Sequence, residues 1–510
     1  MSQPSHDDQR HRTLLQSIAR RAMLERGLLP DFSAAALAEL DRMQAPTMKD
    51  GVPGEKGGQR PPEHPIRDLR NLLWASIDND DSRDLDQLTV AEAMPAGRVK
   101  VLVAIADVDA VVKSNSAIDQ HARQNTTSVY TAAEIFPMLP EKISTDITSL
   151  NFNQERLAIV VELVMGADGT LQDSNIYQAW VRNHAKLAYN SLAAWLEGNG
   201  ALPEAVAAVS GLEENLRLQE QVTQKMKNLR QIHGALSLET IQAKPVFDGD
   251  QIRTLEAEEK NRAKEIIEDL MIAVNGVTAR YLSARKFPSI RRVVSMPKRW
   301  ERIVEIANAH GSKLPGTPDS KALDAFLIKE KAADPLRFPD LSLAVIKLLG
   351  NGEYVAELPE GNAPGHFGLA VKDYGHATAP NRRYPDLLTQ RLLKAAIAGQ
   401  PVPYTKDELD VLAAHCTAAE DAATKVERQL EKSAAALLLE SRIGEQFDAI
   451  TTGASEKGTW VRLLSLPVEG KLVQGFAGVD VGDRLRVQLI ETDVEQGYID
   501  FKKVNPSQHR

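Results

Sequence analysis

The sequence predicts an α/β (α+β) multidomain protein with a small helical N-terminal module, a central mixed domain and a C-terminal β-barrel. Three observations lead to this prediction. The first 45 residues show helical periodicity, the segment 66–440 mixes buried-strand runs with long helical patterns, and short strand-like runs follow Gly444. A chain of 510 residues with 43% hydrophobic content can build several buried cores.

The N-terminal module, residues 1–45, is predicted to contain two amphipathic helices. The first ends at Gly27, a common helix stop, and the second begins at Ser33, a good N-cap residue. This module could contact RNA in the manner of a helix-turn-helix, or it could have a structural or partner-docking role. Residues 46–65 are rich in glycine, proline and charge, which is typical of a linker.

Composition limits the classes of function. The net charge is −9, so contacts with nucleic acid must come from local basic stripes. The single cysteine, Cys416, excludes a disulfide framework and fits a reducing compartment. The N-terminus is polar and no run approaches 18 apolar residues, so we expect a cytoplasmic protein without a signal peptide or a membrane span.

The central segment combines strands and helices, and the C-terminal segment is made of strands. Apolar runs at 99–106 and 157–165 predict buried strands. Helical patterns cover 211–233, 254–286, 318–333, 384–398 and 406–444. Five short strands within about 60 residues at 444–505 favour an OB-fold barrel.

An acidic loop at 76–88 is the most informative motif of the chain. It contains five aspartates within nine positions: Asp78, Asp80, Asp81, Asp84 and Asp86. Such carboxylates repel one another unless a cation lies between them, and Mg²⁺ prefers a few carboxylates with water and substrate phosphate. Asp84 and Asp86 are two positions apart, so in extended chain they face the same side. For an isolated motif of this kind, a solvated acidic turn is the alternative interpretation.

Further motifs occur in a fixed order along the chain, and together with the acidic loop they resemble the ribonuclease II / ribonuclease R family. They are I-D-N-D-D-S-R-D-L-D at 77–86, V-A-I-A-D-V at 103–108, T-S-V-Y at 127–130, P-M-L-P-E-K-I-S at 137–144, I-I-E-D-L-M-I-A-V-N at 266–275 and Y-G-H-A-T-A-P-N-R-R-Y-P-D-L-L at 374–388. The resemblance implies that residues 66–440 form an RNB catalytic domain and 444–505 an OB-fold RNA-binding domain.

The resemblance implies a hydrolytic 3′→5′ exoribonuclease that degrades single-stranded RNA to nucleoside 5′-monophosphates. It implies Mg²⁺ as the cofactor, in one or two ions, with Mn²⁺ as an alternative ion. Asp78, Asp84 and Asp86 match the family's metal-binding aspartates, and Arg382 matches the arginine that contacts the scissile phosphate. Asp86 and Arg382 are therefore the expected catalytic residues.

Five further residues are predicted to bind RNA. Tyr130 and Glu268 match residues that lie near the 3′-terminal nucleotides, and Arg383 follows the expected catalytic arginine. Trp460 and Arg462 lie in the barrel, where aromatic and basic residues suit single-strand binding. Simpler interpretations stay open: Tyr130 and Trp460 as core residues, and Glu268 as a helix-surface residue whose neighbour Asp269 is the true match.

The sequence departs from the family pattern at two places. Gln87 stands where the family commonly has a second adjacent aspartate, so one metal ion could be held more weakly. Ala377, Ala379 and Asn381 replace the family's usual residues beside Arg382. These departures keep a second hypothesis open, in which the chain is a catalytically impaired RNA-binding paralogue.

Overall fold

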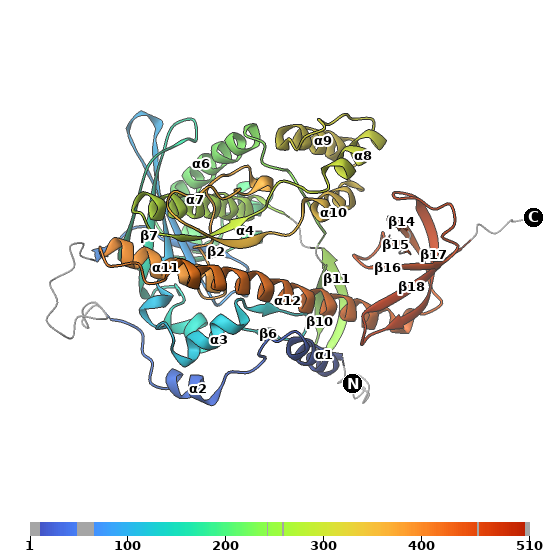
Figure 1. The fold of residues 1–510 in the computed structure, drawn as a ribbon, viewed down its shortest axis with the longest axis horizontal. Helices are drawn as coiled ribbons and strands as arrows, with labels where there is room; N and C mark the ends of the chain where they lie inside the picture. Colours follow the sequence, from blue (N-terminus) through green and yellow to red (C-terminus); the bar gives the residue numbers. More distant parts are fainter. Residues whose placement is uncertain (1–10, 48–65, 242, 258–259, 456–457, 505–510) are drawn as a thin grey trace, which may run out of the picture.

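The computed structural model shows a large central domain joined to a small barrel by one long helix, α12 (Lys406–Leu439) (Figure 1). The structure describes residues 11–47, 66–241, 243–257, 260–455 and 458–504. The first ten residues and nearly all of the predicted linker at 46–65 lie outside these ranges. None of the described helices is both long and apolar enough to cross a membrane.

The central domain is built on a seven-stranded sheet with the order β1-β8-β7-β4-β3-β2-β9. Neighbouring strands are antiparallel, except that β1 pairs with β8 and β2 with β9 in parallel. The two strands predicted from apolar runs are confirmed as the central strands β4 and β7. The strands are β1 (Arg67–Asp68), β2 (Ala75–Asp78), β3 (Gln87–Ala93), β4 (Val99–Ala106), β7 (Glu155–Met165), β8 (Leu171–Arg182) and β9 (Ala185–Ala188).

Both faces of this sheet are covered, which explains why its central strands are continuous apolar runs. On one face, Val101 and Val103 of β4 share a core with Val222 of α6 and Leu270 of α7. On the other face, Leu102 of β4 packs in a core with residues of α3, α11 and α12. The helices involved are α3 (Ala117–Asn125), α6 (Leu212–Ile232), α7 (Arg262–Ala284) and α11 (Tyr384–Ile397).

One predicted helix is wrong at its start. The pattern at 254–286 was expected to be helical throughout, but residues Gln251–Ala257 form strand β11, which pairs with β10 (Ala243–Asp248). Helix α7 begins only after Asn261, whose side chain accepts a hydrogen bond of 3.0 Å from the Lys264 amide. The alternation Q-I-R-T-L-E is strand-like, so pairing with β10 decides its conformation.

The remaining elements of the central domain are short. Helices α8 to α10 pack on one another around Trp300, Phe326 and Phe338. The remaining helices and strands of the central domain are α4 (Tyr189–Leu196), α5 (Glu204–Ala207), α8 (Trp300–Ala309), α9 (Ser320–Ala333), α10 (Phe338–Leu349), β5 (Val129–Tyr130), β6 (Ile135–Phe136), β12 (Ser289–Val293) and β13 (Glu353–Glu357).

The C-terminal segment forms the predicted five-stranded barrel, which is closed in the order β14-β15-β16-β18-β17. Its core contains Phe447, Val461, Leu472 and Phe501. The strands are β14 (Gln446–Ser455), β15 (Gly458–Leu463), β16 (Glu469–Gln474), β17 (Arg484–Asp493) and β18 (Tyr498–Lys503).

The N-terminal helices pack on the central domain at two different places. Leu15 and Ile18 of α1 (His11–Glu25) share a core with Val426 and Leu430 of α12. The second helix, α2 (Ala34–Leu40), lies against α3 instead. These contacts favour the structural role over a helix-turn-helix-like unit.

Candidate active site

The predicted metal-binding carboxylates lie on the loop between the neighbouring strands β2 and β3. Asp78 is the last residue of β2, and Asp86 directly precedes β3. Asp78, Asp84 and Asp86 line one pocket of about 290 Å³, and Tyr130 and Arg382 line the same pocket. The fold therefore brings together five predicted site residues from three distant parts of the chain.

Asp86 is the most buried of these carboxylates, with 2% of its surface exposed. Its Oδ1 accepts a 3.0 Å hydrogen bond from the Asn381 amide, while Oδ2 has no hydrogen-bond partner within the described structure. Arg382 Nε lies 3.7 Å from Oδ2. Burial raises the pKa of Asp86 to about 8, although the positive charge of Arg382 opposes this rise. One carboxylate oxygen of Asp86 thus accepts no hydrogen bond and faces the guanidinium group of Arg382.

Asp84 and Asp78 are less buried than Asp86. Burial raises the pKa of Asp84, and the nearby Asp78 adds to this effect, whereas Arg382 opposes it. The Tyr130 hydroxyl donates to Asp84 Oδ2 at 3.3 Å. Asp78 Oδ1 accepts hydrogen bonds from the Asn79 amide and the Ser82 hydroxyl, at 2.7 and 2.9 Å. One oxygen of Asp78 is therefore already used to shape the loop.

Arg382 is held in place by the loop that carries it. Its carbonyl accepts a 3.0 Å hydrogen bond from the Ser128 amide, which joins this loop to the segment that bears Tyr130. At the base of the loop, the fully buried Asp386 accepts hydrogen bonds from the amides of Thr378 and Ala379, at 2.7 and 2.8 Å. The backbone is thus fixed on both sides of a half-exposed guanidinium group.

The other residues that line the pocket were not predicted as site residues. Gln87 does line the pocket, at the position where the family commonly has an aspartate. Tyr189, at the start of α4, is a second aromatic side chain in the pocket, and no motif marks it. The remaining lining residues are Asn79, Ser82, Ile267, Met271 and Thr378.

The predicted RNA-binding residue Glu268 lies outside the pocket. Glu268 is exposed on α7 and does not line the pocket, although its neighbours Ile267 and Met271 do. Its alternative, Asp269, is buried in an ion pair with Arg230. The structure therefore brings neither carboxylate into the pocket.

The contacts of Arg383 do not support its predicted role in RNA binding. Its Nη2 donates to Asp386 Oδ1 at 2.7 Å and to the Thr378 hydroxyl at 3.2 Å. Arg383 is absent from the pocket lining. Its side chain neutralises the buried Asp386, which gives Arg383 a structural role, and its contact with RNA stays a prediction.

Comparison with known proteins identifies the family. The RNB domain matches residues 66–399, and the RNase II-type exonuclease C-terminal S1 domain matches residues 445–504. The chain belongs to the RNB-domain family. The resemblance predicted from the ordered motifs is thereby confirmed.

Relatives of this RNB protein include Ribonuclease R of Escherichia coli, which is 29% identical over 91% of this chain and 59% of its own length. The chain spans little more than half the length of the curated relatives it matches. A structure of Mycoplasma genitalium RNase R in complex with ribose methylated single-stranded RNA shares the fold, with a TM-score of 0.84 at 22% identity over 96% of this chain and 78% of that chain. Yeast Ssd1, described as a pseudonuclease, also shares it, with a TM-score of 0.71 at 14% identity over 93% and 57%.

The two residues predicted in the S1 domain differ in their surroundings. Trp460 is partly exposed on β15 and is not a residue of the barrel core. Arg462 forms two hydrogen bonds with the Asp340 carboxylate of α10, at 2.8 and 3.1 Å. Both partners of this ion pair are largely buried. Arg462 thus ties the S1 domain to the RNB domain, and its position does not support the predicted RNA contact.

Proposed function

We propose that this chain is a Mg²⁺-dependent 3′→5′ exoribonuclease that hydrolyses single-stranded RNA to nucleoside 5′-monophosphates. The observation that carries the proposal is the pairing of Asp86 with Arg382 in one pocket of an RNB fold. A buried carboxylate with a free oxygen and a guanidinium group can together bind a cation and a phosphate. Relatives named Ribonuclease R support the same reaction.

The pocket fits a divalent cation in a particular way. In the part of the chain that the structure describes, no three Asp, Glu, His or Cys side chains converge into a complete metal site. Mg²⁺ commonly takes one or two carboxylates and fills its other positions with water and substrate phosphate. The Oδ2 of Asp86, which accepts no hydrogen bond, and the carboxylate of Asp84 in the same pocket form this kind of donor set. When bound, the ion would supply charge neutralisation at the phosphate and a more acidic bound water.

The protein's own groups would position the RNA and its reacting phosphate. Arg382 donates hydrogen bonds to the scissile phosphate and stabilises the charge that develops on it. Tyr130, which is 42% exposed in the pocket, offers a surface on which a base can stack regardless of sequence.

A catalytically impaired RNA-binding protein is the second candidate function. Gln87 lines the pocket without supplying a negative charge, which favours this alternative. The pseudonuclease Ssd1 shows that a protein with this fold can lack nuclease activity. The fold alone therefore does not decide between an enzyme and a binding protein.

A labelled-RNA assay separates the two candidates. Single-stranded RNA labelled at its 5′ end is incubated with the protein in Mg²⁺, in Mn²⁺ and in EDTA. We expect a ladder that shortens from the 3′ end in either metal and no products in EDTA. Binding without cleavage in every condition would favour the impaired paralogue, and release of the label as a first product would contradict the 3′→5′ direction.

Arg382→Ala should lower kcat for RNA by roughly 10²–10³-fold, because it removes a donor that acts on developing charge. Equilibrium binding of RNA should change much less. Arg83→Ala is the matched control, since Arg83 is an exposed arginine of the acidic loop that does not line the pocket. Equal kcat values for the two variants would refute the role of Arg382.

Tyr130→Ala should weaken RNA binding by roughly 1–3 kcal/mol, the usual contribution of one stacked base. Tyr130→Phe should bind RNA nearly as well as the wild type, since it keeps the ring and loses only the long hydrogen bond to Asp84. Fluorescence anisotropy with labelled RNA in EDTA measures both. A similar loss in both variants would show that the hydroxyl, rather than stacking, holds the RNA.

A further inference from the structure

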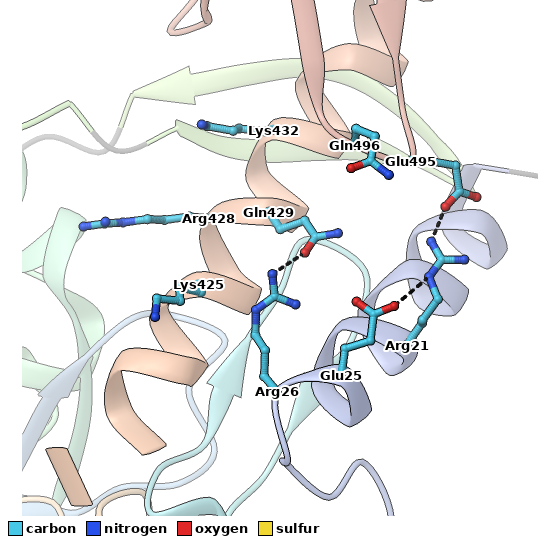
Figure 2. A pocket seen from close by; sticks show the side chains of 9 residues that line it. All are labelled: Arg21, Glu25, Arg26, Lys425, Arg428, Gln429, Lys432, Glu495 and Gln496. Carbon is cyan, nitrogen blue, oxygen red and sulfur yellow. Dashed lines mark hydrogen bonds and ion pairs between the residues drawn. The ribbon is translucent and has the colours of Figure 1, made fainter. Parts of the chain in front are cut away.

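A second cavity, of about 700 Å³, lies where α1, α12 and the turn between β17 and β18 meet (Figure 2). It shares no lining residue with the candidate active site. Five of its nine lining side chains are cationic: Arg21, Arg26, Lys425, Arg428 and Lys432. A local excess of positive charge in a chain of net charge −9 requires an explanation.

Two of these cations are already engaged. Arg21 forms ion pairs with Glu25 and with Glu495, the two carboxylates that line the cavity. Arg26 donates to the Gln429 side chain at 2.8 Å. Dashed lines in Figure 2 mark these contacts, one of which lies within α1.

The other three cations have no ion-pair partner in the described part of the chain. Lys425, Arg428 and Lys432 are all exposed and follow one another at helical spacing along one side of α12 (Figure 2). At 1.5 Å per residue, the row spans about 10 Å. Glu427 and Glu431 of the same helix offset part of the charge of Arg428 and Lys432, but neither forms an ion pair with them in the described part of the chain. Three cations in a row on one helix suit a ligand with regularly spaced negative charges rather than a single small anion.

The row lies on the part of α12 between the segment that carries Tyr130 and the S1 domain. Glu427, which lies between the first two cations in the sequence, accepts a 2.9 Å hydrogen bond from the Tyr130 amide. This turn of α12 therefore holds the backbone of Tyr130, although Glu427 and the row of cations lie on different sides of the helix. At the other end, the turn between β17 and β18 lies close above Lys432, since a Cβ placed on Gly497 would be 2.7 Å from the Lys432 Cβ.

We infer that Lys425, Arg428 and Lys432 bind the phosphate backbone of the RNA upstream of its 3′ end, as the strand passes from the S1 domain towards the active-site pocket. This inference rests on the proposed function for the identity of the ligand. It assigns the row to backbone contact, which holds the strand without reading its sequence.

The test compares the triple variant K425A/R428A/K432A with the wild type in RNA binding at several salt concentrations, with EDTA present to prevent cleavage. We expect the triple variant to bind a long single-stranded RNA on the order of tenfold more weakly. Its plot of log affinity against log salt should be shallower by about 2, because each phosphate contact on single strands contributes about 0.7. The control K113A/K225A/K321A removes three exposed lysines outside the cavity and changes the net charge equally.

Cleavage in Mg²⁺ supplies a second readout. The triple variant should lose kcat/KM on the long RNA but keep the wild-type value on a trinucleotide, which can reach only the active-site pocket. Equal RNA binding and equal salt dependence for the wild type and the triple variant would overturn the inference. An acidic protein partner would then be the favoured ligand of the row. A wild type that cleaves neither RNA would refute the proposed nuclease activity, and the binding comparison would still decide the role of the row.

Discussion

Asp86→Asn is expected to reduce the rate of RNA cleavage on the order of 10³-fold or more. The substitution removes the carboxylate that faces Arg382 and offers its free oxygen to a cation, so it weakens charge stabilisation at the reacting phosphate. Single-turnover cleavage of labelled RNA in saturating Mg²⁺ measures the effect directly.

The fold of this variant should remain intact. An asparagine Oδ1 can still accept the hydrogen bond from the Asn381 amide. In EDTA at pH 8 and above, the variant should unfold at the same temperature as the wild type or at a higher one. The reason is that the folded-state pKa of Asp86, about 8, lies above the unfolded value near 4, so ionisation of the wild-type carboxyl destabilises the fold as the pH rises. A variant that loses activity only because it unfolds would contradict this account.

Asp386→Ala is expected to lower the free energy of unfolding by about 3–5 kcal/mol, which is the usual cost of leaving one partner of a buried ion pair alone. The loss has two sources: Arg383 keeps its charge without a partner, and the amides of Thr378 and Ala379 lose their acceptor. Thermal and denaturant unfolding, followed by circular dichroism, measure the change.

The control for this variant is Asp407→Ala, at an exposed position in the first turn of α12. This control should lower the free energy of unfolding by less than about 1 kcal/mol, because it removes only the interaction of the carboxylate with the helix dipole. If Asp386→Ala and Arg383→Ala both unfolded at the same free energy as the control but no longer bound RNA, that result would support a direct contact between Arg383 and RNA.

Much of the fold could be predicted because local signals and tertiary contacts agree. The glycine at position 27 has a positive φ of 75°, as a helix stop requires, and the five C-terminal strands form where alternation and glycine turns predicted them. The helix predicted from residue 254 began too early because pairing with β10, a tertiary contact, overrides helical periodicity in β11.

The candidate site also has a part that the sequence could predict and a part that it could not. The acidic loop and Arg382 could be found from motifs, and the hydrogen bond from the Asn381 amide to Asp86 shows that the fold joins them. The surroundings of Arg462 could not be predicted, because its partner Asp340 lies in another domain, 122 residues away. The row of cations on α12 could not be predicted as a site either, because only the fold brings α1 and the β17–β18 turn to the same cavity.

The central claim is that RNA is cleaved where Asp86 faces Arg382. The most direct measurement is a crystal structure of the Asp86→Asn protein with single-stranded RNA and Mg²⁺. We predict that the 3′-terminal phosphodiester lies in the pocket within hydrogen-bonding distance of Arg382, with a base stacked on Tyr130. A 3′ end bound elsewhere on the protein, with this pocket filled only by water, would contradict the account.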